Sequence, residues 1–233
     1  MLIAAGLCPH PPLLLDGLRG SVDPVPELRA ACADVASWVR GRAEEAGARV
    51  VVVAGGPRTR SHGPDEPSSA AAFLGTRRAS DPEELPYAVA LGRQLLTAAG
   101  CRVDALQAVA LGEPVAGCVR LGASLVSGPE PVVLLVLADG SARRTQKAPG
   151  YLDPRAAGFD AAWVGAVRAG DPQPLLDLDP QLAAELLCEG RAALQILAGA
   201  ALQGAAGRRM AAGVPFADDP FGVQYVAATW HFL

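Results

Sequence analysis

The sequence predicts an α/β protein: a single domain over residues 1–233, an αβα sandwich with a mostly parallel central sheet. Three observations support this fold class. Nearly continuous apolar runs ending in Gly or Pro are typical of strands that are covered on both faces. Stretches of helical periodicity separate these runs, and such alternation is typical of parallel sheets. The composition, 51% hydrophobic and 19% charged, is that of a packed globular chain.

The strands are predicted from the apolar runs. Three runs are strong, and the one at 103–111 is shorter. They are LIAAGL (2–7), RVVVVAGG (49–56), VDALQAVAL (103–111) and PVVLLVLADG (131–140). Two further strands are expected at the end of the chain, on either side of the turn ADDPFG.

Helices are predicted between and after these strands. In 26–47 the apolar residues recur at helical spacing and Gly47 suits the helix end. Two of the later helices open with Asp-Pro, an N-cap followed by Pro at the first helical position. The later helices are expected at 86–100, 113–128, 153–170, 179–190 and 191–204. The polar stretch 55–86 is predicted to be a loop, and a loop of that length is usually functional or mobile.

Charge and motif content argue against several functions. A net charge of −4 gives no reason to expect a nucleic-acid partner. No apolar stretch reaches the roughly 18–20 residues of a membrane span, and the N-terminus has no signal-peptide pattern. Five dispersed cysteines indicate free thiols and a cytoplasmic location. Dinucleotide fingerprints, Walker loops and GxSxG elbows are absent from the sequence.

Two histidines follow predicted strand ends, where ligands bind in parallel sheets. His10 lies in CPHPP and His62 in GGPRTRSHG. Two imidazoles and one carboxylate form the common non-haem Fe(II) site, and the third ligand could be Glu189, Cys188 or Asp139. In the alternative interpretation His10 caps a turn and His62 is solvated. Residue spacing leaves both interpretations open.

The segment DGSARRTQKAPGYLD (139–153) leaves the strongest strand. Backbone N–H groups after a strand, with Arg nearby, suit a carboxylate or phosphate. The alternative is a solvated basic loop with an acidic residue that caps a turn. The candidate ligand-binding residues are Asp139, Ser141, Arg143, Arg144 and Lys147.

The stretches CPHPPLL, VVVVAGGP and LADGSARRTQKAPGYLDPRAAGFDAA occur in an order and spacing that resembles the class III extradiol ring-cleavage dioxygenases. The chain looks like the iron-carrying subunit of the protocatechuate 4,5-dioxygenase type, with the related Memo family alongside. It is also similar to uncharacterised actinobacterial proteins described as subunit-B-like. The resemblance covers nearly the whole chain, to PFGVQYVAATW, and implies an αβα fold with Fe(II) or another divalent metal.

The resemblance also implies a set of metal ligands. His10 matches the family's first iron-ligand His. The second follows a Gly-Pro, where this chain has Thr59, with His62 three residues later. The third falls at Cys188 or Glu189, and a carboxylate is the harder ligand for Fe(II). The expected ligands are therefore His10, His62 and Glu189.

The family's acid/base His follows the third motif strand, where this chain has Ser141 and Ala142. Extradiol cleavage needs a proton acceptor and donor, and neither residue titrates usefully. Arg143 can bind an anion but cannot act as a base near neutral pH.

The resemblance therefore implies a divergent member that binds a divalent metal and a small aromatic or anionic molecule. If it is active, it would be a non-haem metal-dependent oxidoreductase. The alternative expectation is a non-catalytic, Memo-like binding or scaffold protein on the same fold. A homo-oligomer is a further expectation, because several relatives are oligomers.

Overall fold

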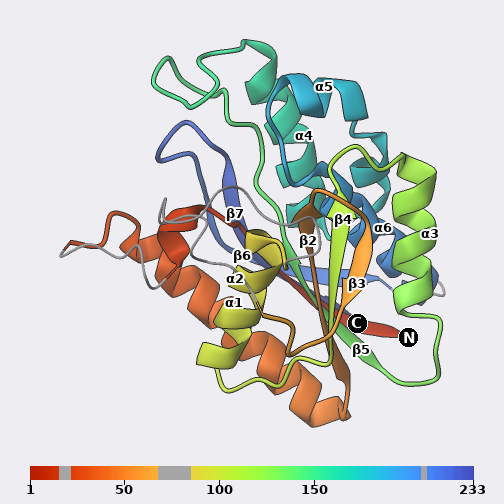
Figure 1. Ribbon diagram of the computed structural model, residues 1–233. Coiled ribbons are helices and arrows are strands. Elements are labelled where there is room, and N and C mark those ends of the chain that lie inside the picture. Colours follow the sequence, from red (N-terminus) through yellow and green to blue (C-terminus); the bar gives the residue numbers. More distant parts are fainter. Residues whose placement is uncertain (16–21, 68–84, 206–208) are drawn as a thin grey trace.

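The structure, a computed structural model, describes residues 1–15, 22–67, 85–205 and 209–233 (Figure 1). The strands are β1 (Leu2–Cys8), β2 (Arg49–Gly56), β3 (Arg60–His62), β4 (Ala105–Ala110), β5 (Val132–Leu137), β6 (Met210–Asp218) and β7 (Tyr225–Phe232). The helices are α1 (Pro26–Ala46), α2 (Tyr87–Ala98), α3 (Val115–Leu125), α4 (Arg155–Ala169), α5 (Pro180–Glu185) and α6 (Arg191–Ala205). Short 3₁₀ turns lie at Pro12–Leu14 and Gln173–Asp177.

The seven strands form one mixed sheet in the order β3-β4-β2-β5-β1-β7-β6. The four strands β1, β2, β4 and β5 run parallel to one another. The strands β3, β7 and β6 are antiparallel to their neighbours. The predicted α/β class is therefore confirmed.

Two details differ from the expected elements. The short strand β3 lies in the stretch 55–86, which was expected to be a loop; its three residues, Arg-Ser-His, carry no apolar alternation that could reveal a strand. The part of that loop at 68–84 lies outside the described residues. Helix α5 ends at Glu185 rather than near 190, because Leu187 has a φ of 55°, which a right-handed helix cannot contain.

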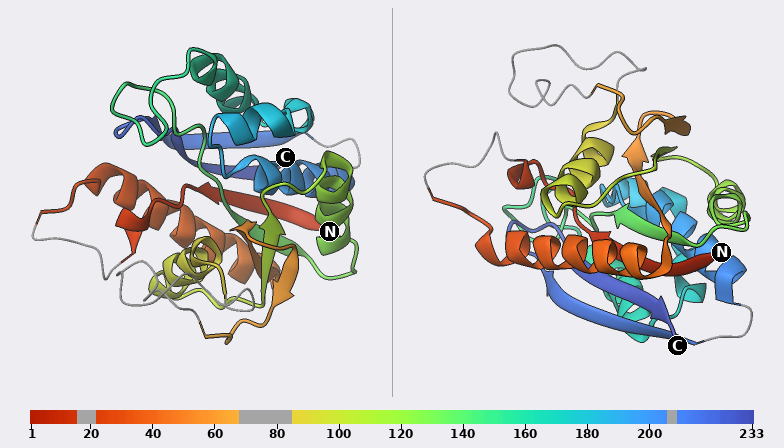
Figure 2. Two further views of the ribbon diagram at one scale, coloured as in Figure 1. Left: turned by 45° about the horizontal axis from the view of Figure 1, so that its top comes forward. Right: turned by 90° about the horizontal axis from the view of Figure 1, so that it is seen from below.

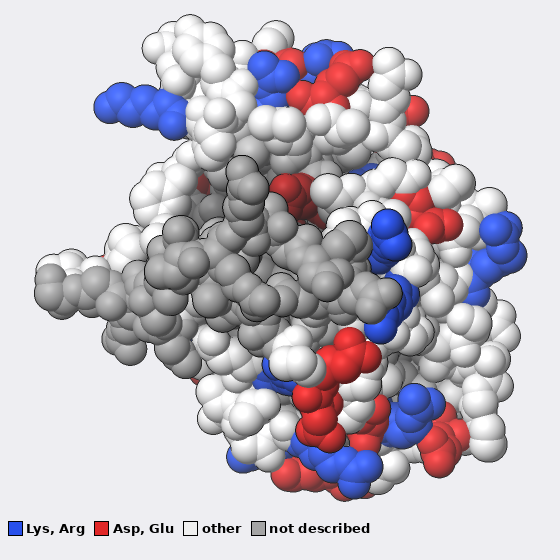
Figure 3. All heavy atoms as spheres, viewed as in Figure 1, with Lys and Arg blue, Asp and Glu red and all other residues white. Residues whose placement is uncertain are grey.

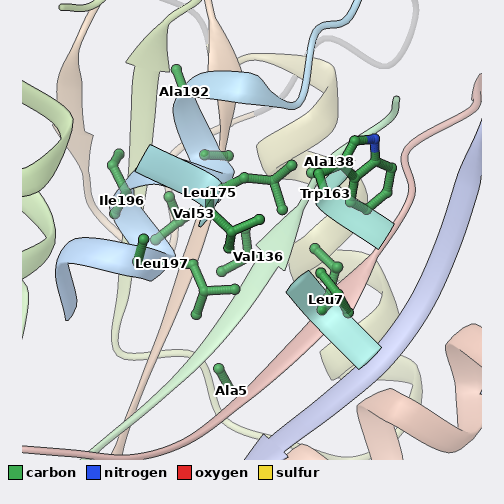
Figure 4. Packing of buried hydrophobic residues seen from close by; sticks show 14 of the residues in the cluster. Ala5, Leu7, Val53, Val136, Ala138, Trp163, Leu175, Ala192, Ile196 and Leu197 are labelled. Atoms are coloured by element: carbon green, nitrogen blue, oxygen red, sulfur yellow. The ribbon is translucent and has the colours of Figure 1, made fainter. Parts of the chain in front are cut away.

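Helices cover both faces of the sheet, so the domain has three layers (Figure 2). Alternate residues of a strand point to opposite faces. Accordingly, Val51 and Val53 of β2 pack in one apolar cluster with residues of α3, α4 and α6. Val50 and Val52 pack in the other cluster, with residues of α1 and α2. Figure 4 shows part of the first cluster around Val53, Val136 and Leu197.

Helices α3 and α6 approach one another closely. A Cβ atom at Gly122 would overlap the Ile196 carbonyl oxygen, and one at Gly199 would lie 2.6 Å from the Val119 carbonyl oxygen. Glycine at both positions therefore permits this approach, which sets the position of α6 and of the residues that precede it.

The strands β1, β5 and β2 end at the same edge of the sheet, here called the carboxyl edge. The segment that leads into α6 crosses this edge, and the Gly190 backbone N–H donates to the Asp139 carbonyl oxygen at 3.0 Å. Among the described residues, no helix combines the length and apolar character that a membrane crossing requires. Acidic and basic side chains are interspersed on the part of the face that Figure 3 shows in colour.

Candidate functional site

His10 and Asp139 lie side by side because of the register between two parallel strands. Cys8 of β1 pairs with Leu137 of β5, and His10 and Asp139 each follow two residues later. The His10 backbone N–H donates to Asp139 Oδ1 at 2.7 Å, and His10 Nδ1 lies 3.4 Å from Asp139 Oδ2. The carboxylate therefore fixes both the backbone and the ring of His10.

The other ring nitrogen of His10 has a different environment. The residue is only 1% exposed, and its Nε2 atom is buried without a hydrogen-bond partner among the described residues. Most buried polar side-chain atoms have a partner, and an exception indicates a functional role or a partner outside the chain. The Nε2 atom is thus the clearest sign of a ligand at this edge.

Two tyrosine hydroxyls complete the surroundings of this pair. Tyr87, the first residue of α2, has its hydroxyl 3.0 Å from His10 Nδ1, and the two rings meet edge to face. Burial raises the pKa of Tyr87 well above its usual range, and the nearby Asp139 and Glu189 charges raise it further. Burial and Asp139 likewise raise the pKa of Tyr225. Both hydroxyls therefore stay protonated at neutral pH.

Two carboxyl groups and one thiol of the predicted set also lie here. Burial raises the pKa of Asp139, His10 lowers it, and Glu189 raises it. The Glu189 side chain belongs to an exposed residue. Cys188 is buried, its Sγ lies 3.4 Å from the Asp139 carbonyl oxygen, and burial raises its thiol pKa to about 12. Of the two candidates for a third ligand, Glu189 therefore has the accessible side chain.

The structure does not bring His62 to His10. Four strand spacings of about 4.8 Å separate β3 from β1, which amounts to roughly 19 Å. After β2 the chain turns back, so β3 runs antiparallel to β4 and His62 pairs with Leu106, near the amino end of that strand. Metal–nitrogen bonds measure about 2.0–2.1 Å, so the two imidazoles cannot share an ion.

The expected set of His10, His62 and Glu189 is therefore not one metal centre. His62 is not solvated either: it is 6% exposed, and its Nδ1 lies 2.6 Å from Glu66 Oε2. Across the described part of the chain, no group of three or more His, Cys, Asp or Glu is arranged to hold a metal.

Thr59 occupies the position that the resemblance gives to the second ligand. Its hydroxyl donates to Glu113 Oε2 at 2.5 Å and accepts from the Ala110 backbone N–H at 3.1 Å. This side chain therefore ties the chain after β2 to the chain after β4.

Ser141 is fully buried, and its hydrogen bonds are directed to α4. Its backbone N–H donates to Asp160 Oδ1 at 2.9 Å and its hydroxyl donates to Asp160 Oδ2. Trp163 Nε1 donates to the same carboxylate at 3.0 Å. Burial raises the pKa of Asp160, whereas these hydrogen bonds lower it. Ser141 thus anchors the segment after β5 rather than presenting its hydroxyl to a ligand.

The predicted cations of this segment do not form one anion site. Arg143 donates to the Glu185 carbonyl oxygen at 2.9 Å. Arg144 Nε donates to Asp219 Oδ2 at 2.8 Å. Lys147 is exposed and makes no ion pair within the described residues. The two arginines connect the segment to α5 and to the β6–β7 turn. Of the expected ligand-binding residues, Asp139 is the one that contacts His10 in the described part of the chain.

Sequence reasoning missed Tyr87, Tyr225 and Asp160. The chain has only three tyrosines, and the helix at Tyr87 follows directly on the polar stretch. Asp160 is the lone acidic residue within an otherwise apolar helical stretch, GFDAAW. The small number of tyrosines and the isolated acidic residue in an apolar helix could both be seen in the sequence.

No family model and no curated protein matches this chain. Among solved structures, the chain is similar to an uncharacterized protein, JW3007, from Escherichia coli K12. The TM-score is 0.55 at 13% sequence identity, and the match covers 98% of this chain and 99% of the other. At this identity the likeness shows the fold alone.

Proposed function

We propose that this chain is a divergent member of the class III extradiol dioxygenase superfamily that binds a small aromatic molecule at the carboxyl edge of β1 and β5. The observation that carries the proposal is the buried His10 Nε2 atom, which has no partner among the described residues. Asp139 and Tyr87 both lie at the Nδ1 side of the His10 ring, so Nε2 is the ring nitrogen that a ligand can contact.

The surroundings of His10 indicate which group it contacts. A carboxylate oxygen near Nδ1 favours the tautomer with the proton at Nδ1, so Nε2 becomes a hydrogen-bond acceptor. A phenolic hydroxyl suits this acceptor. A carboxylate suits it less, because the carboxyl groups of Asp139 and Glu189 already lie at this edge. An aromatic diol is therefore the preferred ligand.

The donor set does not fit a three-ligand metal centre. His10 Nε2 is a suitable ligand atom and Glu189 lies at the same edge, but the second imidazole is missing. His62 lies on β3, roughly 19 Å across the sheet from β1, and Thr59 is bound to Glu113. The proposed contacts are therefore those of the chain's own residues. Ring cleavage is also outside the proposal, because Ser141 stands where the resemblance places the acid/base His.

A second candidate, a non-catalytic binding protein on the same fold, is favoured by the bonding of two of these residues. Thr59 and Ser141 both use their hydroxyls in internal hydrogen bonds. Such a protein would bind the ligand but leave it unchanged. Oxygen uptake with catechol as substrate tests this second candidate, because turnover above background excludes a purely binding role.

The proposal is tested by anaerobic calorimetric titration of catechol into the full chain, with and without added Fe(II). We expect binding by the wild type, and a loss of at least about tenfold in affinity in His10→Ala, equivalent to one hydrogen bond of about 1.4 kcal/mol. His62→Ala is the matched control and should keep the wild-type affinity. Absence of catechol binding in both titrations, or equal affinity in His10→Ala, refutes the proposal.

A further inference from the structure

Two large apolar residues near the carboxyl edge have left-handed backbone conformations. Tyr151 has a φ of 60° and Leu187 a φ of 55°, and no other non-glycine residue in the described ranges has a positive φ. This conformation is strained for a bulky residue with a Cβ atom. Both side chains are also exposed, Tyr151 by 61% and Leu187 by 49%. The chain thus keeps exposed apolar side chains at two positions where glycine would be easier to accommodate.

The two residues lie next to each other. A Cβ atom on Gly150 would lie 2.6 Å from Leu187 Cδ1, so the leucine side chain rests on the residue before Tyr151. The Ala142 backbone N–H donates to the Leu186 carbonyl oxygen at 3.0 Å, and Gly150 N–H donates to the Ala142 carbonyl oxygen at 2.9 Å. These bonds join the segment after β5 to the segment before α6.

The pair also lies close to the candidate ligand site. Leu187 precedes Glu189 by two residues, and consecutive Cα atoms are 3.8 Å apart, so their Cα atoms are within about 7.6 Å. Phe221 adds a third apolar side chain, 41% exposed. Its neighbour Gly222 accepts from the Arg144 backbone N–H at 3.0 Å, so Phe221 adjoins the same segment.

We propose that Tyr151, Leu187 and Phe221 form an apolar rim that contacts an apolar substituent on the ring of the bound ligand. The inference rests on the proposed function and narrows its ligand class to aromatic diols with a bulky apolar substituent. Strained backbone persists where the surrounding structure enforces it, and it gathers at ligand-binding sites. Clustered exposed apolar residues mark contact surfaces, and the segment that carries Leu187 is hydrogen-bonded through the Gly190 backbone N–H to Asp139, the partner of His10.

Two ligands and three variants test the rim. The ligands are catechol and 4-phenylcatechol, titrated anaerobically into the full chain. The variants are Tyr151→Gly, Leu187→Gly and the control Leu202→Ala, whose exposed leucine lies near the far end of α6. Glycine adopts a positive φ without strain, so both glycine variants should melt no lower than the wild type.

The wild type and Leu202→Ala should bind 4-phenylcatechol at least about fivefold more tightly than catechol, a difference of about 1 kcal/mol. In each glycine variant this preference should fall toward one, with catechol affinity unchanged. Catechol binding without any preference for the phenyl compound overturns the rim and leaves the proposed function standing. A phenyl preference that depends on the rim but persists in His10→Ala, titrated alongside these variants, overturns the proposed function. Binding of neither ligand overturns both.

Discussion

Replacement of Asp160 by alanine should destabilise the protein far more than replacement by asparagine. The carboxylate is 1% exposed, and its Oδ1 accepts from the Ser141 backbone N–H and from Trp163 Nε1. Alanine leaves two buried N–H groups without a partner, at about 1–3 kcal/mol each. The loss of a buried charge offsets part of this, so we expect a net cost of about 3–4 kcal/mol.

Asparagine keeps the oxygen that accepts both N–H bonds. Its amide nitrogen can donate to the Ser141 hydroxyl, which rotates to accept. We therefore expect Asp160→Asn to cost less than about 1.5 kcal/mol. Urea unfolding followed by circular dichroism at neutral pH measures both values. Equal costs for the two variants, or an alanine cost below about 1 kcal/mol, would refute the hydrogen-bond reasoning.

Three further predictions concern packing, titration and reactivity. In Gly165→Ala the added Cβ atom in α4 meets open space, so this variant should raise the unfolding free energy by about 0.5–1 kcal/mol. In Gly122→Ala the added Cβ atom overlaps the Ile196 carbonyl oxygen, so this variant should lower the unfolding free energy by about 2–3 kcal/mol. The thermal melts of the two variants should shift in opposite directions. Burial raises the pKa of Asp160, so the folded state binds the proton of this carboxyl group more tightly than the unfolded chain does. The stability that results is fully present below the ordinary Asp pKa of about 3.9 and is lost as the pH rises through the raised pKa. The stability of the wild type relative to Asp160→Asn should therefore increase on acidification. All five cysteines are free and buried, and burial raises the pKa of Cys118 to about 11 and that of Cys188 to about 12. A thiol-specific chromogenic disulfide should therefore react with no cysteine of the native protein at pH 8 and with all five in denaturant.

Most helices and strands could be predicted because their signals are local. Apolar runs such as 49–56, and the Gly47 that ends α1, depend on residues adjacent in the chain. The same reasoning could not find β3, whose pairing with β4 depends on a strand more than 40 residues away. It also extended α5 too far, since nothing local indicates the left-handed conformation of Leu187.

The candidate site was predictable only in part, for the same physical reason. His10 and Asp139 follow the parallel strands β1 and β5, which end at one edge, so their proximity follows from the topology of a parallel sheet. His62 was placed with them because it follows β2 in sequence. The turn after β2 reverses the chain within a few residues and carries His62 back to the amino end of β4, and no spacing rule anticipates that reversal.

The bond between His10 and Asp139 joins residues 129 positions apart in the chain. Loops of that length close slowly, because their entropy must be lost before the contact forms. The two side chains can meet only after β1 and β5 have paired, so the site appears with the folded sheet and not before it. A proteolytic fragment lacking either strand should therefore contain no trace of the site, and ligand binding at His10 would serve as a reporter of complete folding.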